Sequence, residues 1–423
     1  MLALAKRLYP ICRSLTGDGN RRTLAILAET VKSLQINEVP SGTKVFDWTI
    51  PREWNCRAGY LEDPDGKIIV DFNDSNLHVL GYSVPVDEYL TLDELNEHLY
   101  SFPEQPDWIP YVTSYYKERW GFCMADRVRK TLKPGKYHAC IDSSLKPGSL
   151  TFGEAFLPGE SDEEIFFSTY ICHPSMANNE LSGPCVAAAL YDYLEQMPCR
   201  RYSYRFAFVP ETIGSITYLS QRFEHLQKHV RAGYNLTCVG DERAFSYLPS
   251  RYGKTLADRV ALNVLRSSHP DFVSYSYLQR GSDERQYCSP GIDLPVCSVM
   301  RTKYGEYPEY HTSADDFSIV TEAGLQGAFD VYKDMITLLE RNVKYKVQCK
   351  CEPQLGARGL YPTISYKGSA GDYVRNMINF LAYADGKNDL VDISEIIKVP
   401  VAKLYPMIDK LVENELIKAV PEP

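Results

Sequence analysis

The sequence predicts an α/β fold in which a mostly parallel sheet lies between layers of helices. Two apolar runs, residues 165–171 and 204–209, have the length and aromatic content of strands buried on both faces. Helical patterns follow both runs, over residues 184–194 and 215–226. Strands that alternate with helices favour a parallel sheet, because each helix carries the chain back to the edge from which the next strand starts.

The composition is that of a globular protein with more than one domain. A chain of 423 residues exceeds one ordinary core, and 44% hydrophobic with 24% charged residues argues against long disorder. The net charge of -9 disfavours general affinity for nucleic acid or anionic lipid. The twelve cysteines mostly lie in apolar patterns, which indicates buried reduced thiols. Without a signal segment or a long apolar run, we expect a soluble cytoplasmic protein that is not attached to a membrane.

The N-terminal third combines scaffold helices with an insertion. Residues 1–38 begin with two helical patterns, which a turn at residues 16–19 separates. Residues 39–129 then change to short segments rich in Trp, Tyr and Pro, and we interpret them as an inserted α+β domain. Within it we expect strands that include residues 45–50 and 67–72, and a short helix capped by Thr91.

The α/β pattern resumes near Tyr137, so residues 1–38 and 130–348 form the main domain in this interpretation. This domain adds a strand and turn over residues 232–241, a strand over 293–300 and a closing helix over 320–341. Beyond it, three short helices and a final strand at 416–420 indicate a winged-helix domain over residues 349–423. Pro406 lies inside the last helix and predicts a kink there.

Polar residues follow three of the predicted strands. The carboxyl ends of parallel strands meet at one edge of a sheet, so we expect these side chains to converge. Two imidazoles with one or more carboxylates suit zinc, which takes nitrogen and oxygen ligands. The alternative is that both histidines are ordinary loop residues. His173, Asn179 and Glu180 follow the first of these strands, and a helix with Ser182 as its expected N-cap comes next. The other two candidates are Glu211 and His311.

Three strings around these residues resemble co-catalytic zinc aminopeptidases and glutamate carboxypeptidases. Residues 176–183, Met-Ala-Asn-Asn-Glu-Leu-Ser-Gly, resemble their G-A-N-D-N-A-S-G motif, residues 210–215 their E-E-x-G-x-x-G-S segment, and residues 310–316 their late Y-H-T-x-x-D-D. The whole layout, with an inserted α+β domain and a C-terminal winged helix, is similar to a bacterial aminopeptidase-like family. The resemblance implies a phosphorylase/hydrolase-like three-layer sandwich of zinc-aminopeptidase type.

The chain departs from these motifs at three positions. The bridging aspartate of the peptidases falls on Asn179, which brings no negative charge, so the comparison favours one zinc ion over two. Their H-x-D pair becomes His173-Pro174-Ser175, without the orienting carboxylate, and their general-base glutamate falls on Pro210. We expect a single zinc to be held by His173, Glu211 and His311, with Asn179 or Glu180 nearby.

Further charged residues are candidates for proton transfer and substrate binding. Asp283 and Glu180 could act on a water molecule, although Asp283 could equally cap a loop or pair with a neighbouring arginine. Arg280, Arg285 and Tyr310 could bind an anionic substrate group, because arginine binds carboxylate and phosphate in a bidentate manner. Solvated surface charge is the alternative for each arginine.

We therefore expect a zinc-dependent amide hydrolase that acts on a peptide or on a small molecule such as an acylated amino sugar. A non-catalytic scaffold or binding protein, for example in cell-surface carbohydrate biosynthesis, is the second hypothesis, and a DNA-binding regulator is the third. The expected recognition helix carries Lys403 and Lys410 against three acidic residues, so it lacks the positive excess that DNA contacts need. Formation of a homo-oligomer or intramolecular docking is the more plausible use of the winged helix.

Overall fold

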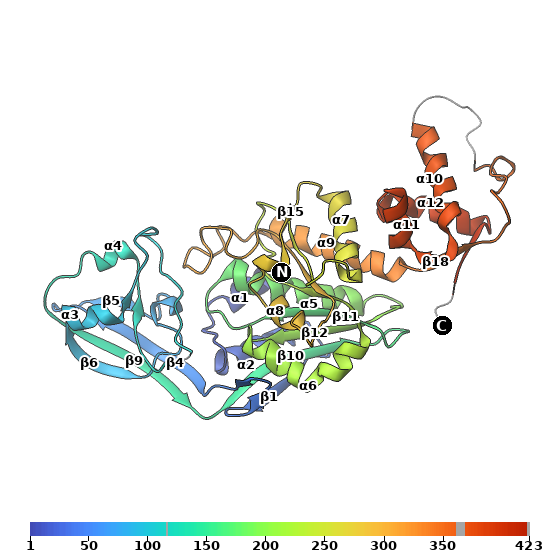
Figure 1. Cartoon of the computed structure of the whole chain (residues 1–423). Coiled ribbons are helices and arrows are strands. Elements are labelled where there is room, and N and C mark those ends of the chain that lie inside the picture. Colours follow the sequence, from blue (N-terminus) through green and yellow to red (C-terminus); the bar gives the residue numbers. More distant parts are fainter. Residues whose placement is uncertain (116, 361–368, 421–423) are drawn as a thin grey trace. The chain divides into compact units, whose positions relative to one another are not determined.

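The protein consists of two compact units. The computed structural model describes residues 1–115, 117–360 and 369–420. Unit 1 comprises residues 1–257 and 273–329, and unit 2 comprises residues 258–272 and 330–423. The two units are described separately below, and Figure 1 shows the elements of both.

A mixed eight-stranded sheet forms the centre of unit 1. Its four middle strands, β12, β11, β13 and β16, run parallel to one another, while β1, β10 and β14 pair in antiparallel fashion. The expected α/β architecture is therefore confirmed, with antiparallel additions on both sides of the parallel centre. In spatial order the strands are β1 (Gln35–Pro40), β10 (Ser149–Leu157), β12 (Ser203–Val209), β11 (Glu164–Tyr170), β13 (Val230–Asn235), β16 (Val296–Met300), β14 (Ser246–Leu248) and β15 (Val273–Ser274).

Helices cover both faces of this sheet, as Figure 1 shows for α5 and α6 on opposite sides of β12. Ser182, the expected N-cap of α5, instead lies in its first turn, because one π-helical turn over Ala177–Leu181 precedes it. The Ser182 hydroxyl donates to the Asn178 carbonyl and accepts the Val239 amide. The helices are α1 (Leu2–Leu8), α2 (Asp18–Leu27), α5 (Ser182–Glu195), α6 (Ile213–His229), α8 (Glu284–Tyr287), and α7 (Leu256–Ser268) and α9 (Glu322–Arg341), which both continue into unit 2.

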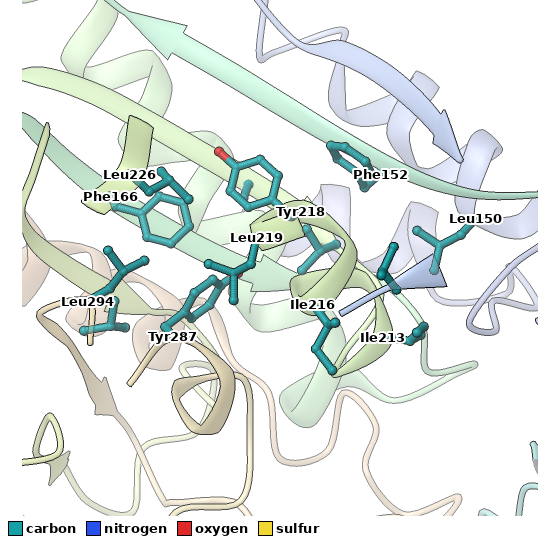
Figure 2. Close-up of a cluster of buried hydrophobic side chains, with 14 of the residues drawn as sticks. Leu150, Phe152, Phe166, Ile213, Ile216, Tyr218, Leu219, Leu226, Tyr287 and Leu294 are labelled. Atoms are coloured by element: carbon teal, nitrogen blue, oxygen red, sulfur yellow. The ribbon is translucent and has the colours of Figure 1, made fainter. Parts of the chain in front are cut away.

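Successive aromatic residues of β11 pack on opposite faces of the sheet, as the two-residue strand period requires. Phe166 packs against Tyr218 of α6 and Tyr287 of α8, in the buried cluster that Figure 2 shows. Phe167 packs on the other face against Phe206 of β12, with ring centroids 5.2 Å apart. Burial on both faces explains why this strand reads as a continuous apolar run.

The inserted segment forms a four-stranded antiparallel sheet in the order β5-β4-β9-β6. Its strand β9 contains Tyr137, so the chain at Tyr137 belongs to this sheet and not to the central one. Thr91 caps α3 with a complete capping box, as expected. The elements are β4 (Glu53–Glu62), β5 (Ile68–Asp71), β6 (Val86–Thr91), α3 (Leu92–Leu95), β7 (Leu99–Tyr100), β8 (Phe122–Cys123), α4 (Asp126–Arg129) and β9 (Lys136–Lys146).

The single strand expected over residues 45–50 is wrong. The structure has a hairpin there, in which β2 (Lys44–Val45) pairs with β3 (Trp48–Thr49). Phe46 adopts a positive φ of 53° in the turn, a conformation that a continuous strand excludes. The hairpin carries Trp48 to the pocket described below.

Unit 2 contains the predicted helices and strand of a winged helix. Two further strands, β17 and β18, complete a three-stranded sheet in the order β18-β17-β19. Pro406 lies inside α12, as expected. The elements are β17 (Lys344–Val347), α10 (Ser369–Tyr383), β18 (Asp385–Asp389), α11 (Leu390–Ile397), α12 (Val401–Glu413) and β19 (Ile417–Ala419).

Two further expectations concern cysteines and membranes. No disulfide joins any of the twelve cysteines, all of which lie in the described part of the chain, and six of them are buried, in agreement with the interpretation as reduced side chains. None of the helices in the described residues combines the length and apolar character that crossing a membrane requires.

Candidate functional site

A pocket of about 400 Å³ opens at the carboxyl ends of β11 and β12 in unit 1. Open α/β sheets bind ligands at this edge. Residues from the central sheet and from the insertion both line it. The lining residues are Leu15, Trp48, Tyr111, Thr113, Tyr115, Cys172, His173, Glu211, Thr212, Ile213, Arg285, Gln286 and His311.

His173 follows β11 and presents its two ring nitrogens to different partners. Its Nε2 lies 3.6 Å from Glu211 Oε2, on the pocket side. Its Nδ1 lies 2.8 Å from Glu180 Oε2, a carboxylate that is fully buried and does not line the pocket. An Nδ1–H that donates to Glu180 leaves the Nε2 lone pair free for the pocket.

Arg13 pairs with Glu180 from the opposite side. Its Nε lies 3.7 Å from Glu180 Oε1 and donates to the His173 carbonyl at 3.0 Å, while its Nη1 donates to the Leu8 carbonyl at 2.7 Å. Both side chains are fully buried. Burial raises the pKa of Glu180, and the Arg13 guanidinium opposes this increase. A buried carboxylate needs such a partner, because an unpaired charge in the interior is strongly destabilising.

His311 approaches the pocket from the loop after β16. Its backbone has a positive φ of 58°, and its ring stacks on Tyr310 with centroids 3.9 Å apart. The ring centroid of His311 lies 5.2 Å from that of His173. His311 Nε2 is buried and has no hydrogen-bond partner among the described residues. A buried ring nitrogen without a hydrogen-bond partner costs folding free energy, so this one points to a partner that is supplied from outside the chain.

The insertion holds this histidine loop in place. The Tyr111 amide donates to the His311 carbonyl, and the Ser313 amide donates to the Ile109 carbonyl, both at 2.9 Å. The rings of Tyr111 and His311 meet edge to face, with centroids 5.2 Å apart. The insertion therefore fixes the position of the second imidazole as well as lining the pocket.

Glu211 lies two residues after the end of β12, next to a second acid, Asp283. Thr212 follows Glu211 with a positive φ of 64°, and its amide donates to Asp283 Oδ1 at 2.7 Å. Ser215 Oγ also donates to Asp283 Oδ1, while Asp283 Oδ2 is buried without a partner in the described residues. Strained backbone of this kind is concentrated at functional sites, where the surrounding structure must hold it.

Ionisation in the pocket follows from burial. Burial lowers the pKa of His173 to about 3, with a contribution from Arg13, and lowers the pKa of His311 well below its usual value. Both imidazoles are therefore neutral at pH 7, the form that binds a metal. Burial raises the pKa of Glu211 to about 8, with a contribution from the Asp283 carboxyl, and raises the pKa of Asp283 to about 7.

The π-helical turn before α5 places Asn179 away from the pocket wall. Asn179 Oδ1 accepts the Tyr170 hydroxyl at 3.1 Å, and the Asn178 and Asn179 amides donate to the two carboxylate oxygens of Asp315. A Cβ at Gly183 would lie 2.3 Å from Thr169 Oγ1, so only glycine allows α5 to begin this close to the sheet. Asn179 thus stabilises the turn that carries Glu180.

The residues at the pocket fit a metal ion in part. Two ligands about 2 Å from a tetrahedral zinc lie roughly 3.4 Å apart, close to the 3.6 Å between His173 Nε2 and Glu211. The orphaned His311 Nε2 supplies a third candidate ligand. One group of acidic, histidine and cysteine side chains within the described residues has ligand atoms that all lie within 4.8 Å of one another. Its members are Cys172, His173 and Glu180. That set surrounds Nδ1 of His173, which Glu180 already occupies. The ligand atoms of His173, Glu211 and His311 do not all meet the same 4.8 Å limit among the described residues, so this pocket-side set is a metal candidate whose side chains an ion would have to draw closer together.

The three candidates for substrate binding have different positions. Arg285 lines the pocket, whereas Arg280 and Tyr310 do not. Arg280 is exposed and packs its guanidinium over Tyr277, 4.7 Å from the ring centroid, and Tyr310 buttresses His311.

Two residues to which the sequence analysis assigned no role are important for the site. Arg13 lies in an apolar stretch between Ile11 and Leu15, and a lone charge in such a context was the available signal. Asp315 belongs to the late string that resembles the peptidases, and it anchors the turn beside Glu180.

Comparison with known proteins identifies the family of each part of the chain. Residues 2–342 match a family described as a domain of unknown function (DUF4910), and residues 343–419 match a winged helix-turn-helix family. A Clostridium acetobutylicum protein named for polysaccharide biosynthesis and for an aminopeptidase-like domain is 43% identical over 421 residues, which cover 99% of this chain and 95% of the relative.

Solved structures extend the comparison to the fold. A Clostridium acetobutylicum crystal structure named as a peptidase matches with a TM-score of 0.92 at 42% identity, covering 99% of this chain and 95% of the other. A zinc aminopeptidase from Bacillus subtilis matches with a TM-score of 0.57 at 12% identity, covering 79% and 92%. An M28 peptidase precursor from Shewanella amazonensis matches with a TM-score of 0.56 at 11% identity, covering 83% and 94%. The chain thus has the zinc-aminopeptidase fold, and a winged helix follows it.

Proposed function

Since the chain belongs to the DUF4910 family and has an aminopeptidase-like fold, we propose that it is a metal-dependent hydrolase of an amide bond. The substrate is a peptide or a modified small molecule such as an acylated amino sugar. The single observation that carries this proposal is the buried His311 Nε2 without a partner among the described residues, beside His173 and Glu211 in one pocket. One zinc ion is the proposed cofactor.

The pocket-side residues would hold the ion through His173, Glu211 and His311. A zinc ion there would supply Lewis acidity, which polarises an amide carbonyl and makes a water molecule more acidic. Neutral imidazoles and a carboxylate are the ligand types that catalytic zinc sites use.

Proton transfer is the proposed role of Asp283. Its pKa of about 7 lets it accept and release a proton near neutral pH, which is the condition for efficient general base catalysis. Its Oδ2 has no hydrogen-bond partner among the described residues, and its charge acts directly on Glu211. Glu180 is less suited, because its carboxylate is already paired with His173 and Arg13. We therefore assign Glu180 to orientation of His173.

The name of a similar protein also supports a particular substrate class. The name of the Clostridium acetobutylicum protein refers to polysaccharide biosynthesis, and this favours an amide on a sugar over a peptide bond. In this chain Pro210 replaces the general-base glutamate of the peptidases, and this also supports a substrate other than a peptide. A non-catalytic scaffold is the competing hypothesis.

A hydrolysis assay tests the proposal. Chelator-treated protein is given zinc and then N-acetylated amino sugars or leucine p-nitroanilide, and the release of acetate or nitroaniline is measured. We expect zinc-dependent release that His311→Ala abolishes and His138→Ala leaves unchanged, because His138 lies on the insertion sheet outside the pocket. Protein that hydrolyses neither class and behaves identically after chelation would support the scaffold.

A further inference from the structure

Among its lining residues, the pocket has one guanidinium and one carboxyl group besides its two imidazoles. Arg285 of α8 and Glu211 supply them. The Arg285 guanidinium is held firmly: its Nε donates to the Ser282 carbonyl at 2.9 Å, and its Nη2 donates to Thr212 Oγ1 at 2.8 Å. Both of these hydrogen-bond partners are uncharged, and the Arg285 charge acts on the Glu211 and Asp283 carboxyls at longer range, where it opposes the rise in their pKa values.

Arg285 shares this kind of anchoring with Arg200, which carbonyl groups hold, but differs from three other arginines of unit 1. Arg21, Arg205 and Arg243 all form ion pairs with carboxylates at 2.5 to 2.8 Å. Arg285 has no carboxylate oxygen within 4.0 Å in the part of the chain that the structure describes. Its Nη1 donors remain available on the pocket wall, and arginine N–H groups in such a position match the oxygens of a carboxylate or phosphate.

Among the described residues that line the pocket, a free amine would meet no acidic group besides Glu211. The Glu211 carboxyl is the acidic group on the pocket lining, and the proposed function already uses it as a metal ligand. Asp283 lies beneath it and accepts the Thr212 amide and the Ser215 hydroxyl. The ammonium group of an unmodified peptide N-terminus would therefore meet the positive charge of Arg285 without a carboxylate to compensate.

Aromatic side chains from the insertion line the same pocket. Trp48, Tyr111 and Tyr115 contribute apolar surface, and the volume of about 400 Å³ is in the range of small-molecule sites. This combination suits a ring with polar substituents, such as a monosaccharide, better than an extended peptide.

On the basis of the proposed function, we propose that Arg285 binds an anionic group of the substrate, so that this site acts on acidic N-acylated molecules and not on free N-termini. The anion is a carboxylate or a phosphate on a ring the size of a monosaccharide. Arg285 is a specificity-determining residue in this account, and Thr212 and the Ser282 carbonyl position it.

Binding measurements with sugars of different charge test this inference. The probes are N-acetylmuramic acid, N-acetylglucosamine 6-phosphate, N-acetylglucosamine and glucosamine, which share a ring and carry a carboxylate, a phosphate, no charge and an ammonium. Isothermal titration calorimetry with wild-type protein should give at least tenfold tighter binding for one of the two anions than for N-acetylglucosamine, and the weakest binding for glucosamine. The arm that binds identifies carboxylate or phosphate.

Variants then assign the effect to Arg285. Arg285→Met should remove the anion preference, and Arg285→Lys should retain part of it, because lysine keeps the charge but not the planar pair of donors. Arg280→Met is the matched control and should bind as the wild type does, since Arg280 lies outside the pocket. Equal binding of anionic and neutral sugars by wild-type protein, or an unchanged preference in Arg285→Met, would overturn the inference.

The same series separates this inference from the proposed function. The Arg285-dependent preference for anions is measured by binding, without turnover. It should persist in chelator-treated protein, because a chelator removes a metal ion and leaves the Arg285 side chain in place. If the preference persists while no amide is hydrolysed, the proposed function fails and the anion site stands. If neutral amides are hydrolysed with zinc and no preference for anions is found, the anion site fails alone.

Discussion

Glu180 Oε2 lies 2.8 Å from His173 Nδ1, and this contact directs the other ring nitrogen of His173 toward the pocket. The family motif places an orienting carboxylate two residues after the histidine, where this chain has Ser175. The structure supplies a carboxylate from the next helical turn instead.

Glu180→Gln should weaken zinc binding about 10- to 100-fold, as loss of the carboxylate behind a metal-binding histidine typically does. Glutamine keeps the shape of the side chain but can present its amide nitrogen to Nδ1 and thereby fix the wrong tautomer. Competition with a fluorescent chelator measures the affinity. An unchanged affinity in a correctly folded variant would mean that Glu180 does not orient His173.

Arg13→Met should destabilise unit 1 by about 3–5 kcal/mol, because it leaves the Glu180 charge buried without its partner. The double variant Arg13→Met/Glu180→Gln should recover much of this loss, since it removes both charges. Urea denaturation followed by tryptophan fluorescence gives the free energies of unfolding. Additive effects of the two substitutions would show that the pair does not interact.

Glu53 is expected to make stability depend on acid pH. Two hydrogen bonds from Arg21, at 2.6 and 3.0 Å, and the Ser149 amide lower the pKa of Glu53 from 4.5 to about 2. A carboxylate with a lowered pKa stabilises the fold above its unfolded-state value, and this contribution is lost as the pH falls from about 4.5 through 2.

Glu53→Gln should therefore lower the free energy of unfolding by about 2 kcal/mol at pH 7 and by much less near pH 2. The value at pH 7 is reduced to allow for the partial exposure of Arg21 to solvent. Urea midpoints of wild type and variant at both pH values measure the difference. A cost that is the same at pH 7 and pH 2 would assign the effect to packing and not to charge.

The winged helix is not expected to bind DNA. Arg341 at the end of α9 donates to Asp409 of α12 at 2.6 Å and lies 4.1 Å from the ring centroid of Tyr405, so part of α12 is already engaged within unit 2. Its exposed lysines, Lys403 and Lys410, are balanced by acidic residues. Fluorescence anisotropy with mixed-sequence duplexes should show no saturable binding below about 100 μM at physiological salt. Submicromolar binding that weakens steeply with salt would contradict this.

The sequence predicted the parallel strands and their helices because these segments carry long apolar runs and strong helical periodicity. It placed His173, Glu211 and His311 at one sheet edge because strand ends converge there by topology. It could not place Arg13, whose hydrogen bond to the His173 carbonyl spans 160 residues and leaves no local pattern. The hairpin at Trp48 was also missed, because its positive φ at Phe46 has no glycine to signal it.

The roles of Glu180 and Asn179 needed the structure for a different reason. Both residues lie in a π-helical turn, and its extra residue changes which side chains face the pocket. Sequence spacing alone treats such a turn as ordinary helix or loop. The burial of Glu180 and the hydrogen bond from Tyr170 to Asn179 then follow from the turn and not from residue type.

The most direct test of the account is the zinc content of the purified full-length protein, measured by mass spectrometry of wild type, His173→Ala, His311→Ala and the control His138→Ala. We expect close to one zinc per chain in the wild type and the control, and loss of the ion in both pocket variants while they remain folded. Zinc retained at full stoichiometry in His173→Ala and His311→Ala, or wild-type protein that binds no zinc when it is supplied, would contradict the central claim.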